Sequence, residues 1–373
     1  MSTRNSSLPP RASGQQPNNR KQPVKGAPKK KKKKPQKRGF FGRLVRILLT
    51  LLIITILGVL GYGGYLYWKL ENGVFNAGSK GTVAPGHSAT EKPLTMLILG
   101  TDNRPKHQSR LTDVIMVAAL NPKTKSATIV SLPRDTLVEL NGYKQTKINE
   151  FYARFKGKED SSGILAEDEM KTMMGKYLDI DVDYTTILDF QGFRDVVDEL
   201  GGVKVNISDN MCYTDSVDGT NINLKKGPAE LDGDKALDYV RYRKSNCKPK
   251  TKGSDDFDRN KRQNEVLHSL VDQMQSLGGV LNIGKVLDAV DSNMKTDIEN
   301  SQIKDMIATY WKISKDDIEF KPVTGTWRSP YVYINDEELE AAKKSLQDRL
   351  AGVSANSTSE STEGLKVLNN TSP

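Results

Sequence analysis

Three short apolar runs stand out in the chain between residues 94 and 132. They are Leu94–Gly100 (LTMLILG), Val114–Leu120 (VIMVAAL) and Ala127–Leu132 (ATIVSL), and each has about the length of one buried strand. The turn-forming segment Asn121–Lys125 (NPKTK) separates the second run from the third, which predicts a β-hairpin. If the first run also pairs antiparallel with the second, the loop after the first strand, the start of the second and the end of the third lie at one edge of the sheet.

Charged residues gather at that predicted edge, namely Asp102, Arg104, Arg110, Asp113 and Arg134. A single charge at a strand end is as well explained by contact with solvent. Two aspartates and three arginines brought together by strand geometry favour instead a site for an anion and a divalent cation.

The pattern changes after the hairpin, where helical and strand periodicities alternate. Residues 164–178 have apolar positions three and four apart, Tyr184–Phe190 alternates like a strand, Gln191–Leu200 is an amphipathic helix, and Val203–Ile207 is a second strand. This alternation predicts an α/β domain whose sheet is covered on both faces. Two further helices are expected near residues 301–311 and 337–350.

Two later segments add arginines to the candidate site. Asp238–Lys244 (DYVRYRK) is predicted to be extended, so Arg241 and Arg243, two residues apart, would point to one side. A solvated strand face is the alternative for this pair.

The second segment is the predicted helix Asp258–Met274, which has an apolar stripe at helical spacing. Followed toward its amino end, that stripe continues as Gln263, Arg262 and Arg259. A surface helix has no need of such residues on its core-facing side. A helix whose amino end opens onto an anion pocket does, because its free backbone N–H groups and its dipole add to the guanidinium charge.

This set of residues predicts phosphoryl transfer. Arginine forks match phosphate oxygens, and their number, with Lys147 nearby, suggests a pyrophosphate. Asp102 and Asp113 suit Mg²⁺ (or Mn²⁺), which takes one or two carboxylates and shares the substrate phosphates. The sequence has no P-loop motif, and Ser131 lies in no Gly-x-Ser-x-Gly segment, which argues against a P-loop nucleotide hydrolase and an α/β-hydrolase.

The amino-terminal region predicts attachment to a membrane. Residues 1–46 carry 15 Lys or Arg and no Asp or Glu, while the whole chain is +10, so the remainder carries −5. This part is predicted to be a basic, disordered cytoplasmic tail. Residues 47–68 hold no charge and, at about 1.5 Å per residue, can span a bilayer. The positive-inside rule then places the rest outside the cell; a cleaved signal peptide is the alternative.

The remaining boundaries follow composition. A Gly/Ser/Thr-rich linker is expected over 69–92, one catalytic domain over 93–350, and a disordered tail over 351–373. The positive charge of the basic tail at residues 1–46 could bind nucleic acid. Because this tail adjoins the predicted span, membrane topology and contact with anionic lipid headgroups explain its charge better.

The only two cysteines, Cys212 and Cys247, fall in the predicted external domain. One disulfide between them fits an oxidising compartment, and two free buried thiols are the alternative. They do not suggest zinc, since the three histidines, His87, His107 and His268, stand at no ligand spacing.

Several of these motifs, in this order, resemble the LytR-CpsA-Psr family of Gram-positive envelope proteins. The matching segments are Leu99–Asp102, Arg110–Asp113, Ser131–Asp135, Lys147–Asn149, Leu200–Val203, Tyr239–Arg243 and Arg259–Gln263. The resemblance implies a three-layer α-β-α sandwich. It also implies transfer of a glycopolymer (teichoic acid, capsule or another wall polysaccharide) from a polyprenyl-pyrophosphate carrier to peptidoglycan.

The resemblance also implies roles for individual residues. Asp102 and Asp113 would hold Mg²⁺, with Asp113 also a candidate base. The pyrophosphate would be bound by Arg134, Arg241, Arg243, Arg262 and Gln263, supported by Arg104, Arg110, Lys147 and Arg259. An apolar tunnel for the lipid is expected between sheet and helices, lined by Ile187, Phe190 and Val197.

Two other functions remain open on the sequence. The same residues would serve a lipid-pyrophosphate hydrolase, in which water replaces the sugar hydroxyl. A non-enzymatic envelope regulator, or transcriptional attenuator, is the second alternative, although the basic tail is too short for a DNA-reading fold.

Overall fold

The computed structural model describes most of the region that follows the predicted linker. The described residues are Gly64, Gly81, 83–102, 111–216, 219–276, 285–286 and 288–353. The basic tail, the predicted span apart from Gly64, the loop with Arg104 and Arg110, and residues 354–373 lie outside them. Within the described residues, no helix combines the length and apolar character needed to cross a membrane.

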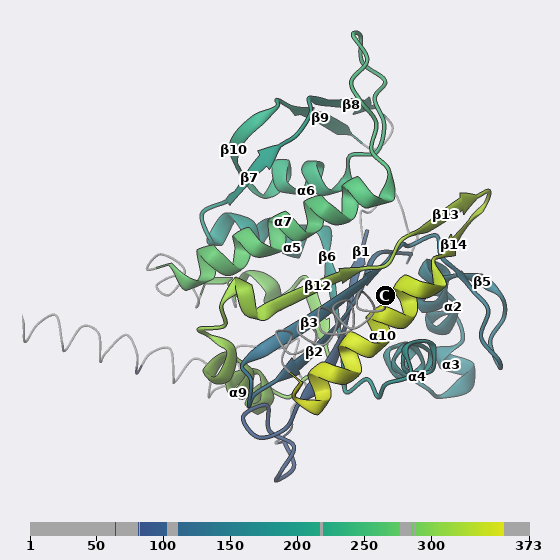
Figure 1. Ribbon diagram of the computed structural model, residues 1–373, viewed down its shortest axis with the longest axis vertical. Helices are drawn as coiled ribbons and strands as arrows, with labels where there is room; N and C mark the ends of the chain where they lie inside the picture. The colour runs from purple at the N-terminus through teal and green to yellow at the C-terminus, as the bar shows by residue number, and fades with distance from the viewer. Residues whose placement is uncertain are drawn as a thin grey trace, which may run out of the picture. The chain divides into compact units, whose positions relative to one another are not determined.

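A six-stranded mixed sheet forms the centre of the domain (Figure 1). Its order is β11-β6-β1-β2-β3-β12, with these bounds: β1 Leu94–Thr101, β2 Thr112–Asn121, β3 Ser126–Leu132, β6 Tyr184–Asp189, β11 Met294–Thr296 and β12 Ile318–Pro322. Strand β2 pairs antiparallel with both β1 and β3, which confirms the predicted up-down-up arrangement. Strands β6 and β12 extend the sheet in parallel with β1 and β3.

The other elements cover this sheet or extend from it. The helices are α2 Phe151–Lys156, α3 Glu159–Ser162, α4 Ala166–Leu178, α5 Phe190–Glu199, α6 Gly233–Arg241, α7 Asp256–Gln275, α9 Asn300–Tyr310 and α10 Asp336–Ala351, with 3₁₀ turns η1 Ile148–Glu150 and η2 Lys315–Asp317. Four two-stranded ribbons pair β4 Leu137–Val138 with β5 Thr146–Lys147, β7 Val203–Ile207 with β10 Gly227–Leu231, β8 Met211–Asp215 with β9 Thr220–Leu224, and β13 Gly325–Arg328 with β14 Tyr331–Ile334.

The two faces of the sheet are covered by different helices. Alternate residues such as Leu97 and Leu99 of β1, with Val117 of β2, are fully buried and pack against residues of α2, α4 and α10. Helices α5, α6 and α7 lie on the other side (Figure 1) and, with β7–β10, enclose a second core around Tyr239 and Val266. Because a strand alternates its side chains between faces, this arrangement gives the mixed α/β architecture that the sequence predicts.

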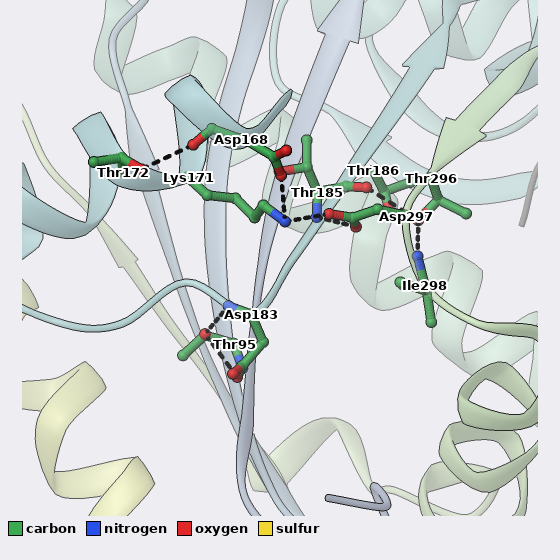
Figure 2. Close-up of polar contacts among 10 residues, drawn as sticks. All are labelled: Thr95, Asp168, Lys171, Thr172, Asp183, Thr185, Thr186, Thr296, Asp297 and Ile298. Carbon is green, nitrogen blue, oxygen red and sulfur yellow. Dashed lines mark hydrogen bonds and ion pairs between the residues drawn. The ribbon is translucent and has the colours of Figure 1, made fainter. Parts of the chain in front are cut away.

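Polar contacts fix the β11–β6 edge to α4 (Figure 2). Lys171 of α4 lies 2.5 Å from an Asp297 oxygen, and the other oxygen of Asp297 accepts the Thr185 amide at 2.7 Å. Burial alone would lower the pKa of Lys171, but its contacts with Asp297 and Asp168 raise it above the ordinary value. The short strand β11 is therefore held by charge-assisted contacts as well as by its ladder.

Candidate functional site

A cavity of about 390 Å³ lies between the sheet and the helices of its second face. Its apolar wall is formed by side chains from β1, β2, β6, α5, α6 and α7, including Ile98, Met116, Leu188, Phe190, Val240 and Leu267. Five of the charged residues predicted for the site line the same cavity, together with the uncharged Gln263: Asp113, Arg134, Arg241, Arg243 and Arg259. One space thus combines an apolar wall with four guanidinium groups.

A β-bulge directs Asp113 toward this cavity. Gly100 pairs with Val114, but the next residue, Thr101, pairs with Thr112, so Asp113 is the additional residue on β2. A bulge of this kind changes the direction of a side chain; without it, Asp113 would share the packed face with Ile115. A Cβ on Gly100 would lie 2.8 Å from the Cβ of Val114, so the bulged segment needs glycine here.

Arg134 follows β3 and contacts two carboxylates. Its Nη1 donates a hydrogen bond to Asp113, and its Nε lies 3.5 Å from Asp135. Burial alone would lower the pKa of the Arg134 guanidinium, but Asp113 and Asp135 raise it above the ordinary value. The guanidinium is therefore permanently charged and fixed at the cavity.

Asp135, which was not among the residues predicted for the site, contacts three of its cations. Its carboxylate accepts a hydrogen bond from Lys147 Nζ at 2.9 Å and lies 3.9 Å from Arg243. Burial alone would raise the pKa of Asp135, but Lys147, Arg134 and Arg243 hold it below the ordinary range. Its place beside Arg134 in the Ser131–Asp135 motif was the available signal. Lys147 reaches the site through Asp135 and is not among the residues lining the cavity.

Arg241 and Arg243 both line the cavity, but they are not on a strand. Residues 233–241 form α6, with the Asp232 side chain capping its first turn, so the predicted extended segment at 238–244 is wrong over its first half. The chain leaves the helix at Tyr242, whose φ and ψ are −56° and 128°. This turn in the backbone brings both guanidinium groups to the cavity, and that of Arg241 lies 4.9 Å from the Phe190 ring centre.

Helix α7 presents one face to the cavity, as its sequence predicts. Arg259, Gln263, Val266 and Leu267 all line the space, because residues three and four apart share a side of a helix. The Asp255 side chain accepts the Asp258 amide at 2.7 Å and caps the first turn. The polar residues therefore stand in the first turns and the apolar ones follow.

Arg262 lies on a different side of α7 and does not line the cavity. Arg262 is 4% exposed, and its guanidinium donates to the carbonyls of Tyr239 and Tyr242 at 2.6 and 2.8 Å. Burial lowers the pKa of Arg262 to about 10. The expected grip of Arg262 on the pyrophosphate is therefore replaced by another role, in which it binds the carboxyl end of α6 and so positions Arg241.

The remaining predicted residues fall in several places. Asp102 directly follows β1 and is 9% exposed; it is near the bulge but not among the residues lining the cavity. Phe190 lines the cavity, as expected for the tunnel. Ile187 belongs instead to the opposite, packed face, and Val197 to the second core, so these two do not form the tunnel wall.

The predicted disulfide between Cys212 and Cys247 is present, with Cα atoms 5.9 Å apart. It joins β8 to the segment after α6. Tyr213 and Asp215 of the β8 side, and Arg243 of the other, all line the cavity. The covalent link thus connects two walls of the same space.

A mixed α/β fold thus holds an apolar cavity beside four guanidinium groups, an arrangement that suits a ligand with an apolar part and an anionic part. The model of the LytR_cpsA_psr family matches residues 72–349, and the chain belongs to this family.

Similar proteins include three from Bacillus. One is TagV of Bacillus subtilis, a polyisoprenyl-teichoic acid–peptidoglycan teichoic acid transferase. Its sequence is 30% identical over 306 residues, which are 77% of this chain and 74% of TagV. The crystal structure of TagV superposes with a TM-score of 0.56 at 31% identity and covers 70% of this chain and 98% of the TagV chain. TagU of Bacillus cereus, described as the same kind of transferase, is 34% identical over 69% of this chain and 78% of its own. TagT (YwtF) of Bacillus subtilis, solved with bound octaprenyl pyrophosphate, superposes with a TM-score of 0.50 at 26% identity, covering 73% and 94%.

Proposed function

We propose that this chain is a membrane-anchored transferase that moves a glycopolymer from a polyprenyl-pyrophosphate carrier to peptidoglycan. The observation that carries the proposal is the cavity in which an apolar wall meets Arg134, Arg241, Arg243 and Arg259. The relatives TagV and TagU are named as transferases between polyisoprenyl-linked teichoic acid and peptidoglycan, and TagT binds octaprenyl pyrophosphate. Teichoic acid is the polymer that these relatives favour, and capsule or another wall polysaccharide remains compatible with the cavity.

In this proposal the cavity separates the two parts of the donor. The prenyl chain occupies the apolar wall, where its burial favours binding. The arginines bind the pyrophosphate, and their planar forks match its oxygens. Since Arg134 and Arg243 contact Asp113 and Asp135 before substrate arrives, these two arginines are already oriented for the charge that develops as the phosphate bond breaks.

The reaction exchanges the phosphoanhydride bond of the donor for a phosphate ester bond to the acceptor. A sugar hydroxyl of peptidoglycan attacks the phosphorus that carries the polymer. The bond from that phosphorus to the bridging oxygen breaks, and polyprenyl monophosphate leaves with the electron pair. The hydroxyl proton passes to a base, for which Asp113 is the candidate because its carboxylate lines the cavity.

The donor set is compatible with Mg²⁺ or Mn²⁺. Within the described residues, no group of three or more His, Cys, Asp or Glu side chains could hold a metal by itself. Asp102 and Asp113 stand at the same end of adjacent strands, and Mg²⁺ commonly takes only one or two carboxylates together with substrate phosphates. The ion would neutralise phosphate charge, and these two residues would hold it.

The membrane location completes the proposal. An anchor at residues 47–68, with the basic tail in the cytoplasm, would bring the catalytic domain to the outer surface of a Gram-positive cell membrane. Lipid-linked donor and peptidoglycan both lie on that side. The anchor also makes membrane lipid a partner, whereas nucleic acid has no part in this function.

The decisive substitution is Arg134→Ala in the full-length chain, reconstituted in lipid with a lipid-linked polymer and peptidoglycan. We expect transfer to fall about 100-fold or more, because the change removes a charged contact made to the phosphates and leaves Asp113 unpaired. The measurement is polymer bound to the wall together with released polyprenyl monophosphate. Arg154→Ala, which removes an exposed ion pair with Glu150, is the matched control and should transfer normally.

The same assay distinguishes the alternatives. Release of monophosphate by the unaltered chain without any polymer–wall adduct would identify a hydrolase and reject the transferase. Normal polymer attachment by Arg134→Ala in cells, with altered envelope signalling, would favour the regulator.

A further inference from the structure

A second pocket, of about 290 Å³, opens at the same end of the sheet as the proposed donor site. We call it the second pocket; among its lining residues are Thr101, Tyr152, Ile187, Asp189, Asn293 and Lys295. The proposed binding of the donor and the proposed phosphoryl transfer do not involve this pocket. It is smaller than the usual range of about 300–1,000 Å³ for ligand sites, so it has room for a single ring and not for a polymer.

The second pocket and the donor cavity lie on opposite faces of the sheet. Gly100 and Leu188 line the donor cavity, whereas their chain neighbours Thr101 and Ile187 line the second pocket. Adjacent residues of a strand point to opposite faces. Asp189, which pairs with Thr101 across β1 and β6, lines both spaces, so the two spaces meet at this residue.

One wall of the second pocket carries a buried hydroxyl with unused hydrogen-bonding capacity. Thr101 is 2% exposed, and its Oγ1 has no hydrogen-bond partner among the described residues. A buried polar atom without a partner is unfavourable. The hydroxyl is enclosed in the pocket wall, so a ligand hydroxyl or amide would satisfy it after a small movement of the Thr101 side chain.

Another part of the lining belongs to a polar network. Glu167, which is 5% exposed, accepts hydrogen bonds from Tyr152 and Lys295 at 2.9 and 2.8 Å. Lys295 stands on β11, the strand that the contacts in Figure 2 hold against β6 and α4. The cations of the pocket are thus balanced by carboxylates, since Lys156, also in the lining, pairs with Glu159.

These features favour an uncharged, hydroxyl-rich ring over an anion. The lining combines hydroxyl, amide and charged groups in balance with the apolar surfaces of Ile187 and Met294. Sugars present this mixture of polar edges and apolar faces. An anionic ligand would instead require the excess of positive charge that the donor cavity has.

We propose that the second pocket binds the acceptor sugar, an amino-sugar ring of the glycan strand, and directs its hydroxyl past Asp189 toward the donor phosphorus. This inference rests on the proposed transferase function. The direction of attack favours the acceptor sugar, and not the donor sugar, as the occupant of the second pocket. The reason is that the attacking and leaving oxygens lie roughly in line on opposite sides of the phosphorus. The leaving prenyl phosphate occupies one face of the sheet, so the attacking hydroxyl arrives from the other.

The test uses the full-length chain in lipid, with a soluble N-acetylglucosamine–N-acetylmuramic acid disaccharide as acceptor, its lactyl carboxyl group amidated so that both rings are uncharged. Ser292→Trp fills the pocket, whose lining includes Ser292, and Lys295→Met removes one polar group while keeping most of the side-chain length. We expect Ser292→Trp to abolish disaccharide binding, measured by saturation-transfer NMR without donor. Lys295→Met should raise the acceptor KM about tenfold and leave kcat and the Kd for prenyl pyrophosphate unchanged.

The control is Lys321→Met, which changes an ion-paired lysine on β12, at the far edge of the sheet; it should keep the acceptor KM of the unaltered chain. Unchanged disaccharide binding and KM in both pocket variants, with normal transfer, would overturn the inference and leave the transferase intact. Disaccharide binding that is lost in Ser292→Trp, in a chain that never transfers polymer, would support the pocket and reject the function. Weaker binding of sugar-bearing donor, but not of bare prenyl pyrophosphate or disaccharide, would assign the pocket to the donor sugar and also overturn the inference.

Discussion

The two faces of the central sheet differ in what covers them. On one face Leu97 and Leu99 pack against α2, α4 and α10 with no exposed surface. On the other, the neighbouring Ile98 borders a cavity of about 390 Å³. Both faces belong to the same strands and have similar apolar residues, so hydrophobic pattern alone does not decide between core and binding site. What decides is whether the covering helices supply side chains that fill the space.

A pair of substitutions on β1 gives the largest expected contrast. Leu97→Ala should lower the free energy of unfolding by about 3 kcal/mol, because it removes a fully buried side chain from a closed core. Ile98→Ala should cost less than about 1 kcal/mol, since its side chain already borders open space, and should weaken binding of prenyl pyrophosphate several-fold. Urea denaturation and equilibrium binding measure the two effects. Equal losses of stability would mean that both faces are packed cores.

Two arginines one turn apart on α7 sharpen the comparison. Arg262→Met should destabilise the fold by about 2 kcal/mol, because the carbonyls of Tyr239 and Tyr242 lose their donors. Arg259→Met should change stability little but lower the affinity for prenyl pyrophosphate about tenfold, as the loss of one charged phosphate contact would. The measurements are urea denaturation and equilibrium binding for each variant. If Arg262→Met kept full stability and lost affinity, the structural role of Arg262 would be wrong.

The sequence predicts the packed face more completely than the cavity face. The hairpin of β2 and β3 follows from period-two alternation and one turn segment, which are local signals. The cavity residues come from segments far apart in the chain, and the error at Arg262 shows the difficulty. Its spacing of four from Val266 places both on one stripe, but Val266 borders the cavity whereas the Arg262 guanidinium binds the end of α6. Helical spacing cannot tell which neighbour each residue of a stripe meets.

The segment with Arg241 and Arg243, and the second pocket, were harder to predict from the sequence. Arg241 and Arg243 suggest an extended segment by their spacing, whereas Asp232 and the residues after it favour the helix that forms. The second pocket depends on β11, whose three residues pair with β6 more than 100 positions earlier. A strand so short has no periodicity of its own, so no sequence pattern could indicate that Lys295 and Thr101 would line the same pocket.

The smallest expected effect is on how the free energy of unfolding depends on pH, which should have opposite signs for a carboxylate on each side of the sheet. Burial raises the pKa of Asp238, on α6, to about 6, so the folded state holds this proton more tightly than the unfolded chain. Its contribution to stability is present at low pH and is lost as pH rises from about 4 to 6. Glu167, on α4, has the opposite sign: burial would raise its pKa, but Lys295 and Tyr152 lower it below the ordinary value of 4.5, so its contribution is lost as pH falls below that value.

Substitution by the neutral amide tests both signs. Asp238→Asn should flatten the decline in unfolding free energy between pH 4 and 6 by about 1 kcal/mol, allowing for solvent screening. Glu167→Gln should instead flatten the loss below pH 4.5 and leave the higher range unchanged. Urea denaturation at half-unit pH steps measures both curves. A change of the same sign in the two variants would contradict the electrostatic difference between the cavity side and the packed side, because only opposite pKa shifts give opposite slopes.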